Sequence, residues 1–262
     1  MATEQKKPTV ICVFCGAHAG TNPAHLASAR ALAQQFHKEN ITLVYGGGTN
    51  GIMGELARTL VSLSGPQSVH GIIPTALVKV ETGRRSTKTA ASTNPAAKAL
   101  AGEVLVEEES MEGGRGGKTP ERVLAGYEED IAAQESEYGL TTLVPDMHTR
   151  KQIMAKKVIE GGPGSGFVVL AGGFGTLEEA MEMTTWNQIG IHSRGIVLLN
   201  IEGYWDGLLD WVDRSVKEGF VSEVNRHILV ECKEPEKVVE ALREYQLSGG
   251  RFVLEWEGVK EG

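Results

Sequence analysis

A glycine-rich turn followed by two carboxylates is the part of this sequence with the clearest chemical meaning. The apolar run 167–170 leads into Ala-Gly-Gly-Phe-Gly-Thr-Leu-Glu-Glu at 171–179. This order predicts a strand, then a turn, then a helix that opens on Thr176. Converging backbone N–H groups and the positive end of the helix dipole make such a turn a seat for a phosphate. The carboxylates Glu178 and Glu179 indicate chemistry on the molecule that carries the phosphate. The glycines of the turn are Gly172, Gly173 and Gly175.

The same residues have a second, purely structural interpretation. Thr176 and Glu179 have the spacing of a capping box, in which two side chains satisfy unpaired N–H groups at the start of a helix. The turn alone leaves both interpretations open. A second glycine turn and a pair of basic residues elsewhere in the chain favour the phosphate site.

The second glycine turn, Gly-Gly-Gly-Thr-Asn-Gly at 46–51, follows a predicted strand at 41–45. It lacks the G-x-G-x-x-G pattern of dinucleotide-binding folds, and the next strand, 69–73, does not end in the acidic residue that would hold a ribose. It also lacks the G-K-[ST] of a nucleoside-triphosphate loop. We therefore expect a small monophosphate ligand, bound partly by Gly47 and Gly48, with no bound NAD, no other cofactor and no metal.

The basic pair lies in Met-His-Thr-Arg-Lys at 147–151, at the start of a predicted helix. The helix dipole disfavours cations at this end, so a ligand or a partner must compensate. Arg150 can bind a phosphate or a carboxylate through two hydrogen bonds. Lys151 has the alternative of facing solvent, and His148 is better explained as a capping or supporting residue than as a base.

Predicted strands alternate with predicted helices along most of the chain. This pattern is typical of an α/β fold of the Rossmann-like type, with one parallel sheet and helices on both faces, here in a single domain over 8–246. In such sheets, ligands bind beyond the carboxyl ends of the strands, where both glycine turns and the basic pair fall. The predicted strands are 10–14, 41–45, 69–73, 140–144, 167–170, 196–199 and 228–230, and the predicted helices begin near 22, 52, 147, 176, 205 and 235.

Residues 84–137 interrupt the alternation with low-complexity and charged sequence. The part from 101 to 137 holds eleven acids and three bases, which matches the net charge of −8 of the whole chain. Such a composition buries little apolar surface, so we expect a mobile acidic insertion. We expect a C-terminal tail over 247–262.

The composition of the remainder limits the classes of function. Acids and bases balance outside the acidic segment, and a body without basic excess is a poor binder of nucleic acid. No apolar run is long enough to cross a membrane, and the N-terminus has no apolar signal region, so we expect a cytoplasmic protein. Cys12 lies inside a predicted strand, so Cys12 and Cys15 are expected to be strand cysteines and not a redox pair or a zinc site.

Six longer motifs occur in a fixed order along the chain. They are Val-Tyr-Gly-Gly-Gly at 44–48, Gly-Ile-Met-Gly at 51–54, Gly-Ile-Ile-Pro at 71–74, Met-His-x-Arg-Lys at 147–151, Gly-Gly-x-Gly-Thr-x-x-Glu at 172–179 and Thr-Trp-x-Gln-x-Gly-Ile-His at 185–192. Together they resemble the LONELY GUY family of cytokinin riboside 5'-monophosphate phosphoribohydrolases, over about 8–80 and 138–232. The resemblance implies a Rossmann-like fold and hydrolysis of a nucleoside 5'-monophosphate, such as AMP or isopentenyladenosine monophosphate, to an adenine-type base and ribose 5-phosphate.

The resemblance also implies roles for individual residues. Glu179 matches the catalytic glutamate of the family and Arg150 its catalytic arginine. Cleavage of the glycosidic bond builds oxocarbenium character on the ribose, which a carboxylate stabilises. The positions that match substrate-binding residues are Lys151, Gly172, Gly173, Gly175, Thr176 and Thr185.

Two departures from the family pattern concern the phosphate site. Ala171 stands where the family motif usually begins with proline, and Ala17 and His18 stand where the first loop usually carries serines. A substrate-contacting glutamate of the family falls in the segment replaced by the insertion and has no assigned counterpart here.

The resemblance implies a homodimer, and the apolar residues Trp186, Ile189 and Ile191 cluster near the end of the helix that follows the glycine turn. The alternative to an enzyme is a nucleotide-binding or carrier protein that kept the fold without turnover. Ala17 and Ala171 favour that alternative, whereas Glu179 with Arg150 favours the enzyme.

Overall fold

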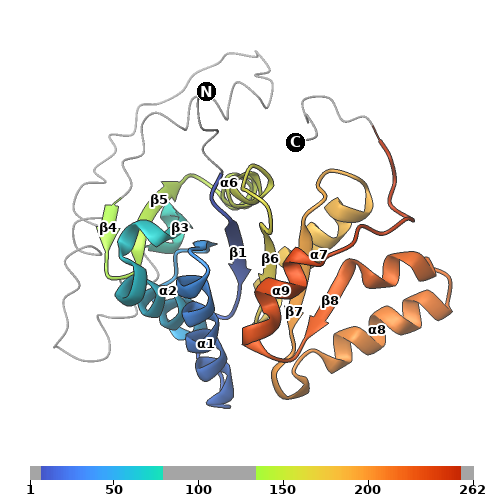
Figure 1. Cartoon of the computed structure of the whole chain (residues 1–262), viewed down its shortest axis with the longest axis horizontal. Helices are drawn as coiled ribbons and strands as arrows, with labels where there is room; N and C mark the ends of the chain where they lie inside the picture. Colours follow the sequence, from blue (N-terminus) through green and yellow to red (C-terminus); the bar gives the residue numbers. More distant parts are fainter. Residues whose placement is uncertain (1–6, 79–133, 255–262) are drawn as a thin grey trace, which may run out of the picture.

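A computed structural model describes residues 7–78 and 134–254. These residues form one α/β domain around an eight-stranded sheet with the order β4-β5-β3-β2-β1-β6-β7-β8 (Figure 1). Every pairing is parallel except that of β4 with β5. The predicted Rossmann-like fold is confirmed. The strands are β1 (Val10–Phe14), β2 (Thr42–Tyr45), β3 (Val69–Pro74), β4 (Gln134–Ser136), β5 (Gly139–Val144), β6 (Gly166–Val169), β7 (Gly195–Leu199) and β8 (Leu229–Cys232).

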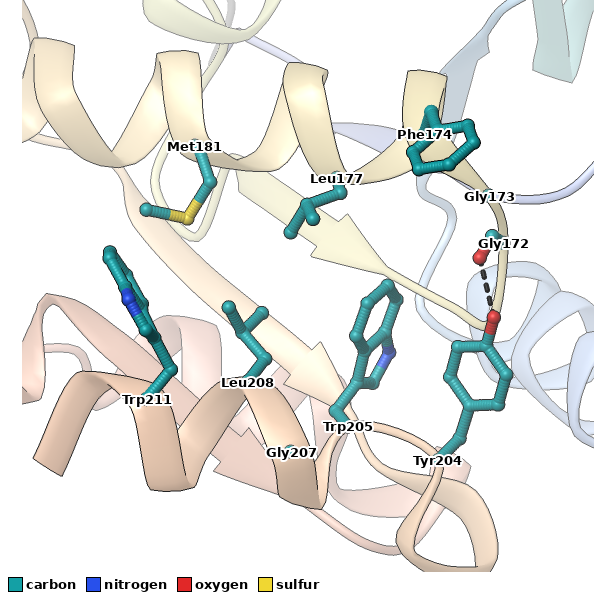
Figure 2. Close-up of a pocket in the computed structure, with 10 residues that line it drawn as sticks. All are labelled: Gly172, Gly173, Phe174, Leu177, Met181, Tyr204, Trp205, Gly207, Leu208 and Trp211. Carbon is teal, nitrogen blue, oxygen red and sulfur yellow. Dashed lines mark hydrogen bonds between the residues drawn. The ribbon is translucent and has the colours of Figure 1, made fainter. Parts of the chain in front are cut away.

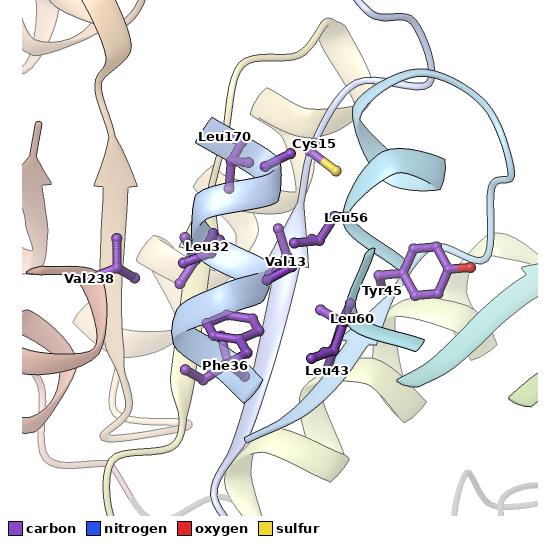
Figure 3. Packing of buried hydrophobic residues seen from close by; sticks show 14 of the residues in the cluster. Val13, Cys15, Leu32, Phe36, Leu43, Tyr45, Leu56, Leu60, Leu170 and Val238 are labelled. Atoms are coloured by element: carbon purple, nitrogen blue, oxygen red, sulfur yellow. The ribbon is translucent and has the colours of Figure 1, made fainter. Parts of the chain in front are cut away.

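Helices cover both faces of the sheet, because the strands are apolar on both sides and alternate side chains point to opposite faces. Ile11 and Val13 of β1 pack with one set of helices, and Cys12 and Phe14 pack with the other. Figure 3 shows the first layer, where Leu32 and Phe36 pack over the strands. That layer holds α1 (Ala24–Lys38), α2 (Gly51–Ser64) and α9 (Val238–Arg243), and the opposite layer holds α6 (Met147–Ile159), α7 (Phe174–Gln188) and α8 (Asp206–Lys217).

The order of the strands decides where a ligand can bind. From β1 the chain progresses outward through β2 and β3, and later outward in the other direction through β6, β7 and β8. The connections after β1 and β6 therefore lead to helices on opposite faces of the sheet, and in open α/β sheets such a switch point at the carboxyl edge is where ligands bind. The glycine turn at 171–175 follows β6 directly and lies at this switch point.

Two boundaries differ from the sequence prediction. The range 84–137 was expected to be an insertion, but Gln134–Ser136 is a strand that pairs antiparallel with β5. Three residues and a tight turn give too little periodicity for a strand to be predicted. The rest of the expected insertion lies outside the described residues except for Glu137.

The C-terminal tail was expected to begin at residue 247, but the chain still contacts the domain beyond that residue. Within 247–254 the chain returns to the end of α7, where the N–H of Phe252 donates to the carbonyl of Gln188 at 2.9 Å. The guanidinium of Arg251 donates to the carbonyls of Asn187 and His192, both at 3.1 Å. These are backbone acceptors, which sequence patterns do not reveal.

Within residues 7–78 and 134–254, no helix combines the length and the apolar character that crossing a bilayer requires.

Candidate active site

Three loops meet at the switch point between β1 and β6. The N–H of Gly16, just after β1, donates to the carbonyl of Ala171 at 2.9 Å, and the carbonyl of Gly16 accepts from the N–H of Met53 at 3.3 Å. Gly51, at the start of α2, has a positive φ of 60°, and a Cβ there would lie 2.4 Å from the backbone of His18. The loop after β1 therefore lies between the two glycine turns, at the carboxyl edge where the sequence placed those turns.

Glu179 and Arg150 meet beneath these loops. Nη1 of Arg150 lies 3.0 Å from Oε1 of Glu179, and their side chains are only 8% and 7% exposed. The two residues were assigned together from the sequence as the catalytic pair, and the structure brings them into contact. A buried ion pair of this kind holds both groups in one geometry, because separating them would leave a charge unpaired in the interior.

The structure fixes the guanidinium of Arg150 from several directions. Its Nε donates to the carbonyl of Ile72, at the end of β3, at 3.1 Å. A Cβ built on Gly46 would lie 2.0 Å from Nη2, so the first glycine of the turn after β2 leaves the space that the guanidinium occupies. Asp146 caps α6 and accepts from the N–H groups of His148 and Thr149. This cap starts the helix so that Arg150 faces inward.

The capping-box interpretation of Glu179 is wrong. Helix α7 begins at Phe174, two residues before the predicted Thr176, and Gly173 occupies the N-cap position without a side-chain cap. Glu179 is thus the sixth residue of the helix, beyond the reach of a capping box. Burial raises the pKa of the Glu179 carboxyl above its ordinary value, against the lowering effect of the Arg150 charge. A raised pKa brings a carboxyl closer to the range in which it exchanges protons near neutral pH.

The glycine turn has one packed side and one open side. A Cβ on Gly172 would meet Oγ1 of the buried Thr176 at 2.1 Å, so this glycine is required by close packing. Gly173 and Gly175 have no neighbouring atom within 4 Å of a Cβ position, and both are exposed. The open side, at the N-terminus of α7, is where backbone N–H groups are available to an anion.

The remaining predicted glycines belong to the second glycine turn. Gly47 and Gly48 are buried in the turn that follows β2. Gly47 has a φ of 76°, which favours glycine, and a Cβ there would come within 3.0 Å of Ile73. They shape the turn beside Arg150.

Lys151 and Thr185 are not brought to the Arg150–Glu179 pair. The Nζ of Lys151 contacts Glu178 and lies 3.0 Å from Glu182, so the basic pair splits, with Arg150 turned inward and Lys151 held by surface carboxylates. Thr185 is exposed, and its hydroxyl donates to the carbonyl of Met181. It lies six residues after Glu179, about 9 Å further along the helix and on a different face.

His192, the last residue of the 185–192 motif, is a structural residue. It is buried, its Nδ1 accepts from the N–H of Arg194 at 3.1 Å, and its Nε2 therefore carries the proton and donates to the carbonyl of Met183 at 2.9 Å. Burial lowers the pKa of His192 to about 4, and the charges of Arg251 and Arg194 act in the same direction. The neutral imidazole ties the loop after α7 back to the helix.

Cys12 is a strand cysteine as expected, whereas Cys15 lies just beyond the end of the strand. Both are buried and unpaired. Burial raises the pKa of each thiol, so neither has the thiolate character of a redox pair. Across the described ranges, no group of three or more His, Cys, Asp or Glu side chains could hold a metal ion.

Sequence reasoning missed three positions that shape the site. Gly46 belongs to the motif at 44–48, but the motif does not indicate that this glycine leaves space for the side chain of Arg150. Asp146 has the N-cap signature, an Asp three residues before Thr149. Tyr204 donates its hydroxyl to the carbonyl of Gly172 at 2.5 Å, and only its place after the predicted strand 196–199 could have indicated it.

We predict that Gly46→Ala displaces the guanidinium of Arg150. The added Cβ would collide with Nη2, and moving the guanidinium leaves the Glu179 carboxylate without its partner, so the free energy of unfolding should fall by about 1–3 kcal/mol. Thermal denaturation measures this. Gly175→Ala is the control, since its Cβ meets nothing. Equal melting temperatures for the two variants would contradict the steric role of Gly46.

We predict that His192 makes stability depend on pH. The unfolded chain takes up a proton below pH 6.5, whereas the folded chain resists it down to about pH 4, so stability should fall as the pH drops between these values, by up to about 3 kcal/mol. His192→Gln should flatten this dependence but not abolish it, because burial also lowers the pKa of His70 to about 4, and denaturation midpoints at several pH values measure the change. The exposed His227→Gln serves as the control. Parallel curves for His192→Gln and the unaltered protein would refute the assignment.

Comparisons with known proteins agree with this geometry. A family model described as "Possible lysine decarboxylase" matches residues 53–242. A cytokinin riboside 5'-monophosphate phosphoribohydrolase of Arabidopsis thaliana is 33% identical over 90% of this chain and 83% of its own length. A bifunctional cytokinin biosynthesis protein of Fusarium pseudograminearum is 42% identical over 96% of this chain, which spans only 43% of that longer protein.

Solved structures support the fold. The molybdenum cofactor carrier protein of Chlamydomonas reinhardtii superimposes with a TM-score of 0.51 over 91% of this chain and 98% of its own, at 13% identity. Such a distant likeness concerns the architecture alone. The motifs, the family match and the extent of the sequence identity all lead to the same conclusion: this chain belongs to the LONELY GUY family.

Proposed function

We propose that this protein hydrolyses the N-glycosidic bond of a nucleoside 5'-monophosphate and releases an adenine-type base and ribose 5-phosphate. The observation that carries the proposal is the buried Glu179–Arg150 pair beneath a glycine turn whose open side suits a phosphate. The relatives that are named phosphoribohydrolases of cytokinin nucleotides support the same reaction class.

In this proposal the start of α7, Glu179 and Arg150 have different roles. The N–H groups at the start of α7 hold the 5'-phosphate and so fix the ribose relative to Glu179. As the bond from C1' to the base breaks, its electron pair leaves with the base and positive charge grows on the ribose. The Glu179 carboxylate stabilises that charge and positions the water whose oxygen bonds to C1', and the proton that this water loses balances the proton that the leaving base takes up. Arg150 holds the carboxylate in place and can orient substrate oxygens.

A carrier protein of the same fold is the competing proposal. A protein that only bound a phosphorylated ligand would gain nothing from a carboxylate close to the phosphate seat, because like charges repel. Here Glu179 is kept buried at a cost in desolvation, and its raised pKa reflects that cost. A costly buried carboxylate beside an anion site favours turnover over storage.

Decarboxylation of lysine, which the description of the family model suggests, does not fit the residues. Such chemistry uses a lysine that forms a Schiff base with pyridoxal phosphate, and that lysine needs a lowered pKa. The lysine next to Arg150 in the sequence is Lys151. Burial alone would lower its pKa, but hydrogen bonds to Glu178 and Glu182 raise it overall. An amine held protonated in this way is a poor nucleophile, so Lys151 does not suit that role.

We predict that Glu179→Gln lowers turnover of a nucleoside monophosphate by at least ~100-fold. Glutamine fills the same volume but lacks the charge that stabilises the transition state. Nucleotide binding should persist, because the glycine turn is unchanged. The assay separates free base from AMP and from isopentenyladenosine monophosphate by chromatography.

Glu178→Gln is the matched control for this variant. Its side chain is 52% exposed and contacts Lys151 at the surface, one residue away from Glu179 on another face of the helix. It should keep near-normal turnover. If Glu179→Gln also does so, the proposed mechanism is wrong.

We also propose that the chain is a homodimer. Of the residues that suggested this, Trp186 packs partly against the core and Ile189 and Ile191 are half-buried, so they offer less surface than expected. Exposed apolar residues near the site include Met147 and Phe174, at 40% and 96%. Light scattering should give about twice the chain mass of 28.1 kDa. A particle of 28.1 kDa at micromolar concentrations would exclude the dimer.

A further inference from the structure

Tyr204 contacts the glycine turn through its hydroxyl. Its hydroxyl donates to the carbonyl of Gly172 at 2.5 Å, and Figure 2 shows the phenol directed at this carbonyl from the segment between β7 and α8. The neighbouring carbonyl, that of Ala171, accepts from Gly16. Two successive carbonyls of the turn are therefore fixed by groups from two other loops.

Burial does not enforce the position of the phenol. Tyr204 is 46% exposed and lines an open apolar cavity of about 660 Å³ between α7 and α8 (Figure 2). Its ring instead makes two edge-to-face contacts, with His25 at a centroid distance of 5.3 Å and with Trp205 at 4.9 Å. These contacts orient the ring so that the hydroxyl reaches Gly172.

The segment that carries Tyr204 is itself anchored at both ends. The buried Asn200 accepts from the N–H of Trp205 at 2.8 Å and donates to Asp206 and Glu231. Between Asn200 and Trp205, Glu202 adopts a positive φ of 50°, a conformation that is costly for a residue with a side chain. Its carboxylate accepts from Asn22, before α1, at 2.5 Å. A residue in such a conformation persists only where neighbouring contacts hold it. The bonds of Asn200 and Glu202 therefore also fix the loop that presents Tyr204.

The bond to Gly172 has a chemical consequence for the phosphate seat. The carbonyl of Gly172 and the N–H of Gly173 belong to one peptide group. A hydrogen bond accepted by the carbonyl polarises that group and makes the N–H a stronger donor. Gly173 is on the open side of the turn, where a phosphate would bind. The phenol therefore both fixes the turn and strengthens one of its donors.

We propose that Tyr204 is a positioning residue for the 5'-phosphate of the substrate. The inference rests on the proposed function for the identity of the ligand, but it concerns binding and not the chemical step. Since the phosphate is held equally in the ground state and in the transition state, loss of the phenol should weaken binding and leave turnover nearly unchanged.

The test compares Tyr204→Phe with the unaltered protein. The KM for AMP should rise by about 2- to 12-fold, the range that one net hydrogen bond allows, with kcat within about twofold. The inhibition constant of ribose 5-phosphate should rise by the same factor. A merely structural role would instead lower the melting temperature and kcat together, with KM and the inhibition constant unchanged, and that result would overturn the inference.

Trp211→Phe is the matched control. Trp211 lines the same cavity and is 51% exposed, but it does not reach the glycine turn in Figure 2. Its KM and inhibition constant should stay at the values of the unaltered protein. An equal rise in both variants would mean that the cavity, and not the hydroxyl, sets phosphate affinity.

Calorimetric titration with ribose 5-phosphate separates this inference from the proposed function. If the protein hydrolyses no nucleoside monophosphate, the proposed function fails. The inference still stands when Tyr204→Phe binds ribose 5-phosphate more weakly than the unaltered protein. Equal affinity, or no binding by the unaltered protein, overturns it.

Discussion

The buried contact between Arg150 and Glu179 is the constraint on which the arrangement of this site depends. Two charges are withdrawn from water, so each needs the other, and neither can move without leaving its partner unpaired. The contact joins α6 to α7 across the carboxyl edge of the sheet. The guanidinium also bonds to the end of β3 and fills the space left by Gly46. Strand ends far apart in the sequence thus meet around one ion pair.

The same contact explains the division between the two faces of α7. Glu179 points toward the sheet and Arg150, whereas Glu178 and Glu182 face outward and hold Lys151. Adjacent carboxylates in the sequence therefore have opposite environments. Desolvation raises the pKa of the inner one, and the outer ones pair with the largely buried Lys151.

Much of the fold and the choice of Arg150 and Glu179 could be predicted from the sequence. Strands buried on both faces are continuous apolar runs, and their parallel order follows from the helices between them, so β1 and β6 could be located within a residue. The pair Arg150 and Glu179 could be assigned because the family motifs fix their spacing. The features that could not be predicted depend on backbone acceptors or on contacts between residues far apart in the sequence. They are the short strand β4, the start of α7 at Phe174, and the bond from Tyr204 to Gly172.

The two ends of the sheet limit how this protein can associate with itself. Within the described residues the sheet stops at β4 and at β8, strands of only three and four residues, and each carries a glutamate, Glu135 or Glu231. Short, charged edge strands are poor templates for the addition of another strand. If copies of the chain associate, these edges favour side-chain packing between helical surfaces, such as the exposed side of α7 that begins with Phe174, over a continuous intermolecular sheet.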